Sequence, residues 1–180
     1  TNNAGITWTS NGTGTFTNAN SLTTATYTPS SGDITAGSRT LTLTVSGNGT
    51  CSSTTSTKTI TISTAPTAVA GTAVSTCSNS GAVNITAGSS ATNNAGITWT
   101  SNGTGSFANA SSLTNATYTP SAADISSGSV TLTLTATGNG GCSNATSTKT
   151  LTITAAPTAV AGTAVSTCSN SGAVNITAGS

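Results

Sequence analysis

Residues 130–136 read Val-Thr-Leu-Thr-Leu-Thr-Ala, and residues 148–154 read Thr-Lys-Thr-Leu-Thr-Ile-Thr. Alternation of apolar and polar residues is the pattern of a β-strand that buries one of its faces. Threonine is β-branched and favours the extended backbone, while its hydroxyl tolerates water. We therefore expect two strands whose aliphatic side chains face a core and whose threonines face solvent.

Weaker strand signals surround this pair at intervals of about ten residues. They predict short strands over 72–76, 82–87, 96–101 and 116–119, with a hairpin turn at Asn102-Gly103 and a single helical turn near Asp124, which would cap it. About seven strands in ~90 residues, without a long helix, predict an all-β fold of immunoglobulin-type antiparallel sandwiches. The expected core aromatics, three in each copy of the pattern, are Trp99, Phe107 and Tyr118, and Trp8, Phe16 and Tyr27.

The whole chain repeats with a period of 91 residues, so that residues 1–14 return at 92–105 and residues 66–89 return at 157–180. This period is too long for one turn of a solenoid, and each copy is expected to be its own small domain. Pro66 and Pro157 mark the joints, because proline avoids central strands and stiffens a short linker. We therefore expect a complete domain at 66–156, the C-terminal two-thirds of a domain at 1–65, and the N-terminal third of a domain at 157–180. We also expect the 180 residues to be a window on a longer periodic polypeptide.

The composition argues against several classes of function. Serine and threonine make up roughly two-fifths of the chain, histidine and glutamate are absent, and the net charge is +1. One aspartate per repeat and no histidine leave no acid–base pair or catalytic triad, so we expect no enzyme, no cofactor and no metal site. The charge is too small to attract nucleic acid, and no apolar run is long enough for membrane insertion.

Cysteine occurs twice per period, at Cys51 and Cys142 in one phase and at Cys77 and Cys168 in the other. Cysteines in a small all-β repeat without zinc ligands predict disulfides formed in an oxidising, extracellular setting. The expected pair is Cys77 with Cys142, inside one domain, and Cys51 and Cys168 would have partners outside the window. Because a sandwich places the first and last turns at opposite ends, a bridge between neighbouring domains remains the alternative.

Two other residue types have a structural and a functional interpretation. Lys149 is expected on the outward, threonine-bearing face of its strand as a solvated side chain, although some fibre domains crosslink a buried lysine to an asparagine. The aromatic residues are expected to fill the core, which would leave no flat platform for stacking on sugars.

Residues 116–136, the segment Gly-Asn-Gly-Gly-Cys that ends at Cys142, and the segment Ser-Thr-Cys-Ser-Asn-Ser-Gly around Cys77 resemble the tandem immunoglobulin-like or PKD-like repeats of giant secreted surface adhesins of Bacteroidota, including gliding bacteria. The resemblance implies a secreted or cell-surface stalk or filament, exported by the type IX route. It implies as partners the neighbouring repeats and lateral copies in a filament. The alternatives are a weak, multivalent glycan-binding or surface-binding module and spacer repeats of a secreted hydrolase.

Overall fold

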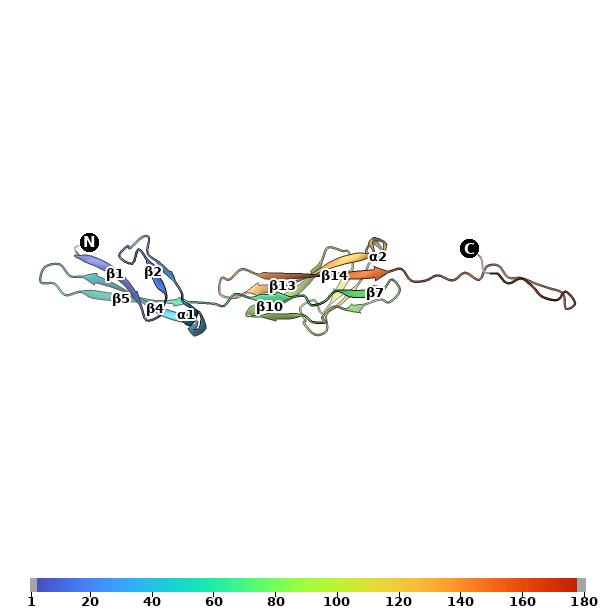
Figure 1. Cartoon of the computed structure of the whole chain (residues 1–180). Helices are drawn as coiled ribbons and strands as arrows, with labels where there is room; N and C mark the ends of the chain where they lie inside the picture. The colour runs from blue at the N-terminus through green and yellow to red at the C-terminus, as the bar shows by residue number, and fades with distance from the viewer. Residues whose placement is uncertain (1–2, 178–180) are drawn as a thin grey trace.

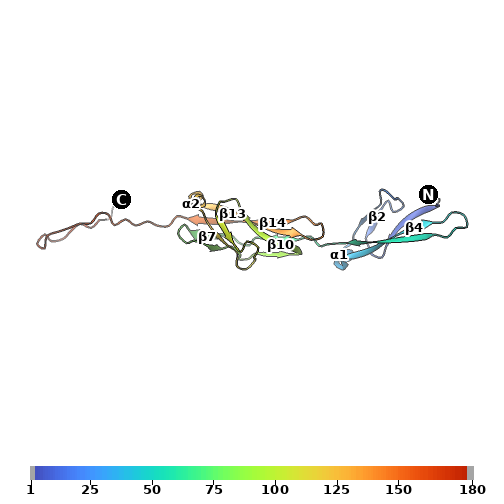
Figure 2. The ribbon, with the colours of Figure 1, turned by 180° about the vertical axis from the view of Figure 1, so that it is seen from behind.

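The computed structural model describes residues 3–177. It contains two β-structured parts that follow one another along an elongated molecule (Figure 1). We call residues 5–63 the N-terminal unit, residues 67–154 the central domain and residues 155–177 the tail. The tail has no strand or helix and leads away from the central domain on the side opposite the N-terminal unit, as the view from behind also shows (Figure 2).

The central domain is a two-layer β-sandwich. One sheet has the order β10-β13-β14-β7, the other has the order β11-β12-β8, and β6 pairs with β9; β7 and β14 are parallel and every other pair is antiparallel. The elements are β6 (Thr67–Val69), β7 (Val74–Cys77), β8 (Val83–Asn84), β9 (Ser90–Thr92), β10 (Asn94–Ser101), β11 (Ser106–Ala108), β12 (Thr117–Thr119), α2 (Ala122–Ser127), β13 (Ser129–Gly138) and β14 (Ala145–Thr154). In chain order β8, β11 and β12 correspond to strands B, D and E of an immunoglobulin domain, and β10, β13 and β14 correspond to C, F and G. The first strands differ from the simplest pattern, because β7 joins the C-F-G sheet in parallel with β14 and β6 pairs with β9. The structure thus confirms the predicted all-β, immunoglobulin-like fold.

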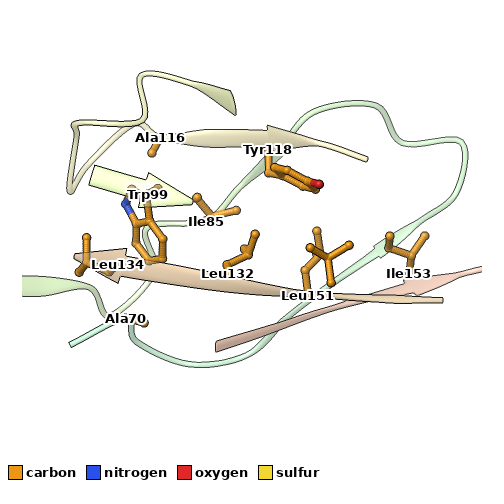
Figure 3. Packing of buried hydrophobic residues seen from close by; sticks show 10 residues of the cluster. Ala70, Ile85, Trp99, Ala116, Tyr118, Leu132, Leu134, Leu151 and Ile153 are labelled. Carbon is orange, nitrogen blue, oxygen red and sulfur yellow. The ribbon is translucent and has the colours of Figure 1, made fainter. Parts of the chain in front are cut away.

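The alternating segments build the core as predicted. Along β13, Leu132 and Leu134 are completely buried and the intervening threonines are not. Trp99 on β10 and Leu151 on β14 pack beside them, facing the second layer, from which Tyr118 points inward (Figure 3). Ile85, which follows β8, lies between the two layers and is 0% exposed. Residues far apart in the chain therefore share one hydrophobic interior.

The short helix α2 begins and ends at residues that the local sequence specifies. Ser121 is its N-cap and accepts a hydrogen bond from the backbone N–H of Asp124, whose carboxylate accepts one from the N–H of Ser121. This reciprocal pair is a capping box. Gly128 ends the helix in the left-handed conformation, at φ 72°, where glycine has no steric penalty. The predicted helical turn with Asp124 as a capping residue is confirmed.

The N-terminal unit repeats only part of this architecture. It consists of β1 (Gly5–Ser10), β2 (Thr15–Thr17), β3 (Thr26–Thr28), α1 (Ser31–Ala36), β4 (Ser38–Ser46) and β5 (Thr54–Thr61). The sheet β1-β4-β5 has the register of β10-β13-β14, with Trp8 opposite Leu43 as Trp99 is opposite Leu134. Within residues 3–177, no segment of this unit takes the places that β6 to β9 have in the central domain. In the described residues, one side of the interior between its two layers is therefore not covered by strands.

Candidate assembly site

The open face of the N-terminal unit is a cleft of about 490 Å³. One wall belongs to β2 and β3 and the loop between them, and the other belongs to the sheet β1-β4-β5. The lining is apolar at its centre, with Leu22, which is 61% exposed, at its margin. The lining residues are Trp8, Phe16, Leu22, Thr23, Ala25, Thr26, Tyr27, Leu41, Lys58, Thr59, Ile60 and Thr61.

In the central domain the corresponding space is filled by the segment 66–89. β8 pairs with β12, which places Val83 opposite Tyr118, and β7 pairs with β14, which places Val74 opposite Leu151. The backbone N–H of Ile85 donates to the carbonyl of Ala116 at 3.1 Å, which fixes the position of its side chain in the core. The cleft thus lies at the place that segment 66–89 fills in the central domain.

The exposed fractions of the tryptophans and tyrosines differ between the two parts accordingly. Trp99 is 1% exposed and Tyr118 is 0% exposed, whereas Trp8 and Tyr27 at the matching positions are only half-buried. The tilted contact of each tyrosine with its phenylalanine is the same in both parts, with ring centroids 4.8 Å apart for Phe16 and Tyr27 and for Phe107 and Tyr118. The predicted core aromatics thus lie at the core positions of both parts, but only the central domain encloses its tryptophan and tyrosine.

The tail repeats the sequence of segment 66–89, but its apolar side chains are exposed to solvent. Residues 157–180 have the sequence of residues 66–89. Ile176, the counterpart of the buried Ile85, is 80% exposed, and Val165, the counterpart of Val74, is 58% exposed. The same sequence therefore has two environments in the described residues, buried at 66–89 and exposed at 157–177.

The single carboxylate of each part organises one end of its sandwich. Asp124 is 4% exposed and accepts hydrogen bonds from the Tyr118 hydroxyl at 2.7 Å, the Thr104 N–H at 3.0 Å and the Gly105 N–H at 2.9 Å, besides that of Ser121. Burial alone would raise the pKa of Asp124, but these donors outweigh it and lower the pKa to about 2. Burial also raises the pKa of Tyr118, and the neighbouring carboxylate acts in the same direction. The carboxylate is saturated with donors and has a structural role.

Asp33 has the same role in the N-terminal unit. It accepts from the Tyr27 hydroxyl at 2.6 Å and from the Thr13 N–H at 3.1 Å, and it forms an ion pair with Arg39 at 2.7 Å. The hydrogen bond from Tyr27 lowers the pKa of Asp33 most, and although burial opposes it, the Arg39 guanidinium lowers the pKa further. This end of the N-terminal unit is therefore assembled even though its face is open.

The prediction that Lys149 faces solvent was wrong. Lys149 shares the phase of Leu151 and Ile153 on β14, so its side chain points inward and is 6% exposed. Its Nζ lies 5.0 Å from the centroid of the Trp99 ring and has no hydrogen-bond partner within the described residues. Burial lowers the pKa of Lys149, because the charged form loses its hydration. The cation–π contact offsets part of that loss.

We therefore expect Lys149→Met to stabilise the central domain, by about 1 kcal/mol or more, because it removes a desolvated charge and keeps an unbranched side chain of similar length. Lys58→Met is the matched control: Lys58 lies 4.9 Å over the Trp8 ring but is exposed, so the change should alter stability by less than about 0.5 kcal/mol. Urea unfolding of the two variants measures the difference. A destabilised Lys149→Met protein would show that the charge contributes more than its burial costs.

The structure does not bring Cys77 and Cys142 together. Cys77 lies opposite Thr154 at the C-terminal end of β14, whereas Cys142 precedes the N-terminal end of the same strand. This arrangement corrects the predicted pairing inside one domain, since β14 extends through ten residues between the two sites. Cys142 instead contacts the joint with the N-terminal unit, where its Sγ donates to the carbonyl oxygen of Ser63 at 3.4 Å.

The residues described above can contribute three kinds of interaction, namely strand pairing, burial of apolar side chains and thiol chemistry. The described part of the chain holds no group of three or more metal-ligating side chains. Neither helix, at six residues each, is long enough to span a membrane, and no longer helix occurs in residues 3–177. The Gly103 to Gly105 loop, expected as a plain hairpin turn, wraps the Asp124 carboxylate with its N–H groups.

Comparison with known proteins gave structural similarity only. No protein-family model matches the sequence, and no curated protein matches it. Among solved structures, the chain is similar to the I-band fragment I67–I69 of titin (TM-score 0.41, 14% identity, 84% of this chain and 54% of that one). It is also similar to the human desmocollin-1 ectodomain (TM-score 0.40, 13% identity, 85% of this chain and 35% of that one). A third match is human protocadherin-24 EC1-2 (TM-score 0.40, 11% identity, 85% of this chain and 82% of that one). These scores are low, so the immunoglobulin-like assignment depends on the observed strand order.

Two structural features were missed by the sequence analysis, namely the role of segment 66–89 in covering the core and the contact between Cys142 and Ser63. The valine and isoleucine of that segment, Val83 and Ile85, are the signal that could have indicated the first. No sequence signal indicated Ser63, since the contact crosses the joint between two parts of the molecule.

Proposed function

We propose that this chain is a structural repeat of an extracellular stalk or filament on a secreted or cell-surface protein, without catalysis. The observation that carries the proposal is that near-identical immunoglobulin-like parts follow one another end to end with a short joint between β5 and β6 (Figure 1). Residues 66–156 are proposed as the repeating domain. The proposed partners are the neighbouring repeats of the same polypeptide and lateral copies in a filament.

The topology of the central domain suits a load-bearing unit. The chain enters at one end through β6 and leaves at the other through β14, so tension acts along the strands. The parallel pair β7 and β14 links the first part of the domain to its last strand. Tension along the strands loads this pair in shear, and the resistance of the domain to forced unfolding is then set by its unfolding rate.

No specific observation favours the alternative of glycan binding. In the central domain the aromatic rings that could stack on sugars are Trp99 and Tyr118, both buried, and Phe107, which packs against the same core. The exposed faces of β13 and β14 carry mainly threonine, whose hydroxyls are too small to form a stacking platform. The other alternative, spacer repeats of a secreted hydrolase, would have the same architecture, and no feature of the described residues favours it.

The test is a tandem polypeptide of several 91-residue periods, examined by electron microscopy and single-molecule stretching. The proposal predicts thin rods with one bead per period and one unfolding peak of similar force for each bead. Compact particles without periodic beads would contradict it, and so would saturable binding on a glycan array that is lost when outward threonines are replaced.

A further inference from the structure

We propose that consecutive repeats of this polypeptide are joined by a disulfide across their joint, between the second cysteine of one repeat and the first cysteine of the repeat before it. In the proposed repeat, residues 66–156, Cys77 is the first cysteine and Cys142 is the second. The inference rests on the proposed stalk, since it names a covalent contact between its repeats. Both cysteines of the bridge belong to one polypeptide.

The two cysteines of the central domain lie at its opposite ends. Cys77 is exposed, ends β7 and is opposite Thr154, the last residue of β14. Cys142 lies in the turn between β13 and β14, at the end of the domain that faces the N-terminal unit (Figure 1). Each repeat therefore presents one thiol to the joint before it and one thiol to the joint after it.

The turn that contains Cys142 packs against the end of the preceding unit. The Cys142 N–H donates to the carbonyl of Asn139 at 2.9 Å, which closes the turn, and its Sγ lies 3.4 Å from the carbonyl oxygen of Ser63. Gly140, in the same turn, approaches Ser63 so closely that a Cβ at residue 140 would be 2.9 Å from the Cβ of Ser63. The contact at the joint therefore depends on backbone packing as well as on the thiol.

The first cysteine of the preceding repeat belongs at this same place. Ser63 precedes Thr154 by one period of 91 residues. In the central domain Cys77 is opposite Thr154, and the Ser78 N–H donates to the Thr154 carbonyl at 2.9 Å. When the repeat that contains Ser63 is complete, its first cysteine is therefore expected opposite Ser63, and the serine after that cysteine would donate to the carbonyl that Cys142 contacts.

Two thiols that meet at one carbonyl group are near enough to bridge with small adjustments of their turns, since a disulfide requires a Cα separation of ~4.4–6.8 Å. In the bridged form, the Cys142 sulfur would exchange its contact with the Ser63 carbonyl for the S–S bond. That carbonyl would keep the serine N–H as its donor. A bridge across the joint thus avoids the ten-residue length of β14, which separates the two cysteines within a repeat.

Closing the bridge is an oxidation of two thiols. The thiols lose two protons and two electrons and form one S–S bond, and a low-molecular-weight disulfide such as oxidised glutathione accepts them and is cleaved to two thiols. The thiolate of one cysteine attacks the small disulfide, and the thiolate of the other then attacks the protein sulfur of the mixed disulfide. Cys77 is exposed and Cys142 is half-buried, so a small oxidant can reach both kinds of site.

Bridges at every joint would limit how far tension can extend the polypeptide. The shortest covalent path would follow the chain from Cys142 across the joint to Cys168, which is 26 residues on, and would then cross a bridge into the next repeat. This path advances by two repeats and leaves residues 78–141 of each repeat unloaded. Fully extended, it would span about 90 Å, whereas two unbridged repeats would span about 600 Å.

The first arm of the test extends the 180-residue chain with a copy of residues 90–156, so that a complete second repeat follows the central domain. The copied Cys142 then lies at the joint next to Cys77. The chain is equilibrated in a glutathione redox buffer at low concentration, denatured and treated with a maleimide, and intact mass counts the cysteines that carry neither maleimide nor glutathione. We expect two such cysteines, because only one joint of this chain has both of its thiols.

Cys77→Ser should abolish this bridge. Cys168→Ser is the matched control, because it has the same sequence neighbours, and it should keep the bridge. An extended chain without bridged cysteines would overturn the proposal, and so would four bridged cysteines, which would mean one bridge inside each repeat. Survival of the bridge in Cys77→Ser, or its loss in Cys168→Ser, would also overturn it.

The second arm stretches a tandem polypeptide of several periods with and without reductant. In reducing buffer, each unfolding event should lengthen the polypeptide by about 300 Å, and in the oxidised polypeptide the gain from inner repeats should fall at least about fivefold. Replacing the first cysteine of every repeat with serine should restore the full gain under oxidising conditions. Full-length events in the oxidised parent would contradict the bridge and still support the stalk, whereas compact particles without beads in reducing buffer would contradict the stalk itself.

Discussion

Ile85→Ala should reduce the free energy of unfolding of the central domain by about 2–5 kcal/mol, the usual cost of leaving a cavity at a buried isoleucine. Ile85 lies between the two sheets and is 0% exposed (Figure 3). Without its side chain, the interior between the two sheets would lose a completely buried side chain of segment 66–89. The effect is measured by urea unfolding of the full chain, followed by Trp99 fluorescence with Trp8→Phe as the common background.

The chain contains its own control for this experiment. Ile176 has the same sequence neighbours as Ile85, from residue 157 onward, but is 80% exposed. In dilute reducing buffer, Ile176→Ala should change the unfolding free energy of the central domain by less than about 0.5 kcal/mol. Equal effects of the two substitutions would show that the segment 66–89 is not what closes the central sandwich.

Asp124→Ala should be at least as damaging, with a loss of about 3–5 kcal/mol. The change removes the capping box of α2 and takes the carboxylate acceptor away from the Tyr118 hydroxyl and the N–H of Thr104. The N–H of Gly105 loses one of its two acceptors and keeps the Tyr118 oxygen. Ser126→Ala is the control, because its hydroxyl bonds only to a helix carbonyl at the surface. A loss as small as that of the control would mean that water replaces the carboxylate at little cost.

The same carboxylate predicts the acid sensitivity of the domain. Its pKa is about 2 in the folded chain and about 3.9 in an unfolded one. A folded pKa that is depressed stabilises the protein above the unfolded value, and this contribution disappears as the pH falls from about 4 to about 2. The stability difference between the parent chain and Asp124→Ala should therefore narrow across this interval. A difference that stays constant would exclude an ionised Asp124 as its source.

The sequence was most informative where local pattern and tertiary packing agree. The threonine–aliphatic alternation predicted β13 and the end of β14 together with their buried faces, and the Ser121 to Gly128 stretch predicted α2. The same pattern was misread at Lys149, where the residue type suggested solvent although its phase matched Leu151. Here packing against Trp99 overrides the preference of a lysine for water.

Long-range features could not be predicted in the same way. β6 and β9 are only three residues each, and they form because they pair with one another and pack on the sandwich. The predicted pairing of the cysteines was wrong because the repeat period gives the number of thiols in each domain but not the end of the domain at which each thiol lies. The open face and the closing segment become visible only when two copies of the same sequence are compared in two environments.

Hydrogen exchange tests the central claim most directly, namely that the segment 66–89 closes the sandwich of the central domain. In the 180-residue chain, mass spectrometry can compare peptides that cover 106–119 with peptides that cover 15–28, because the two differ in sequence. We predict slow amide exchange at β12, which is paired on both sides, and faster exchange at β3, which is paired only with β2. Equal exchange rates at β12 and β3 would contradict the account.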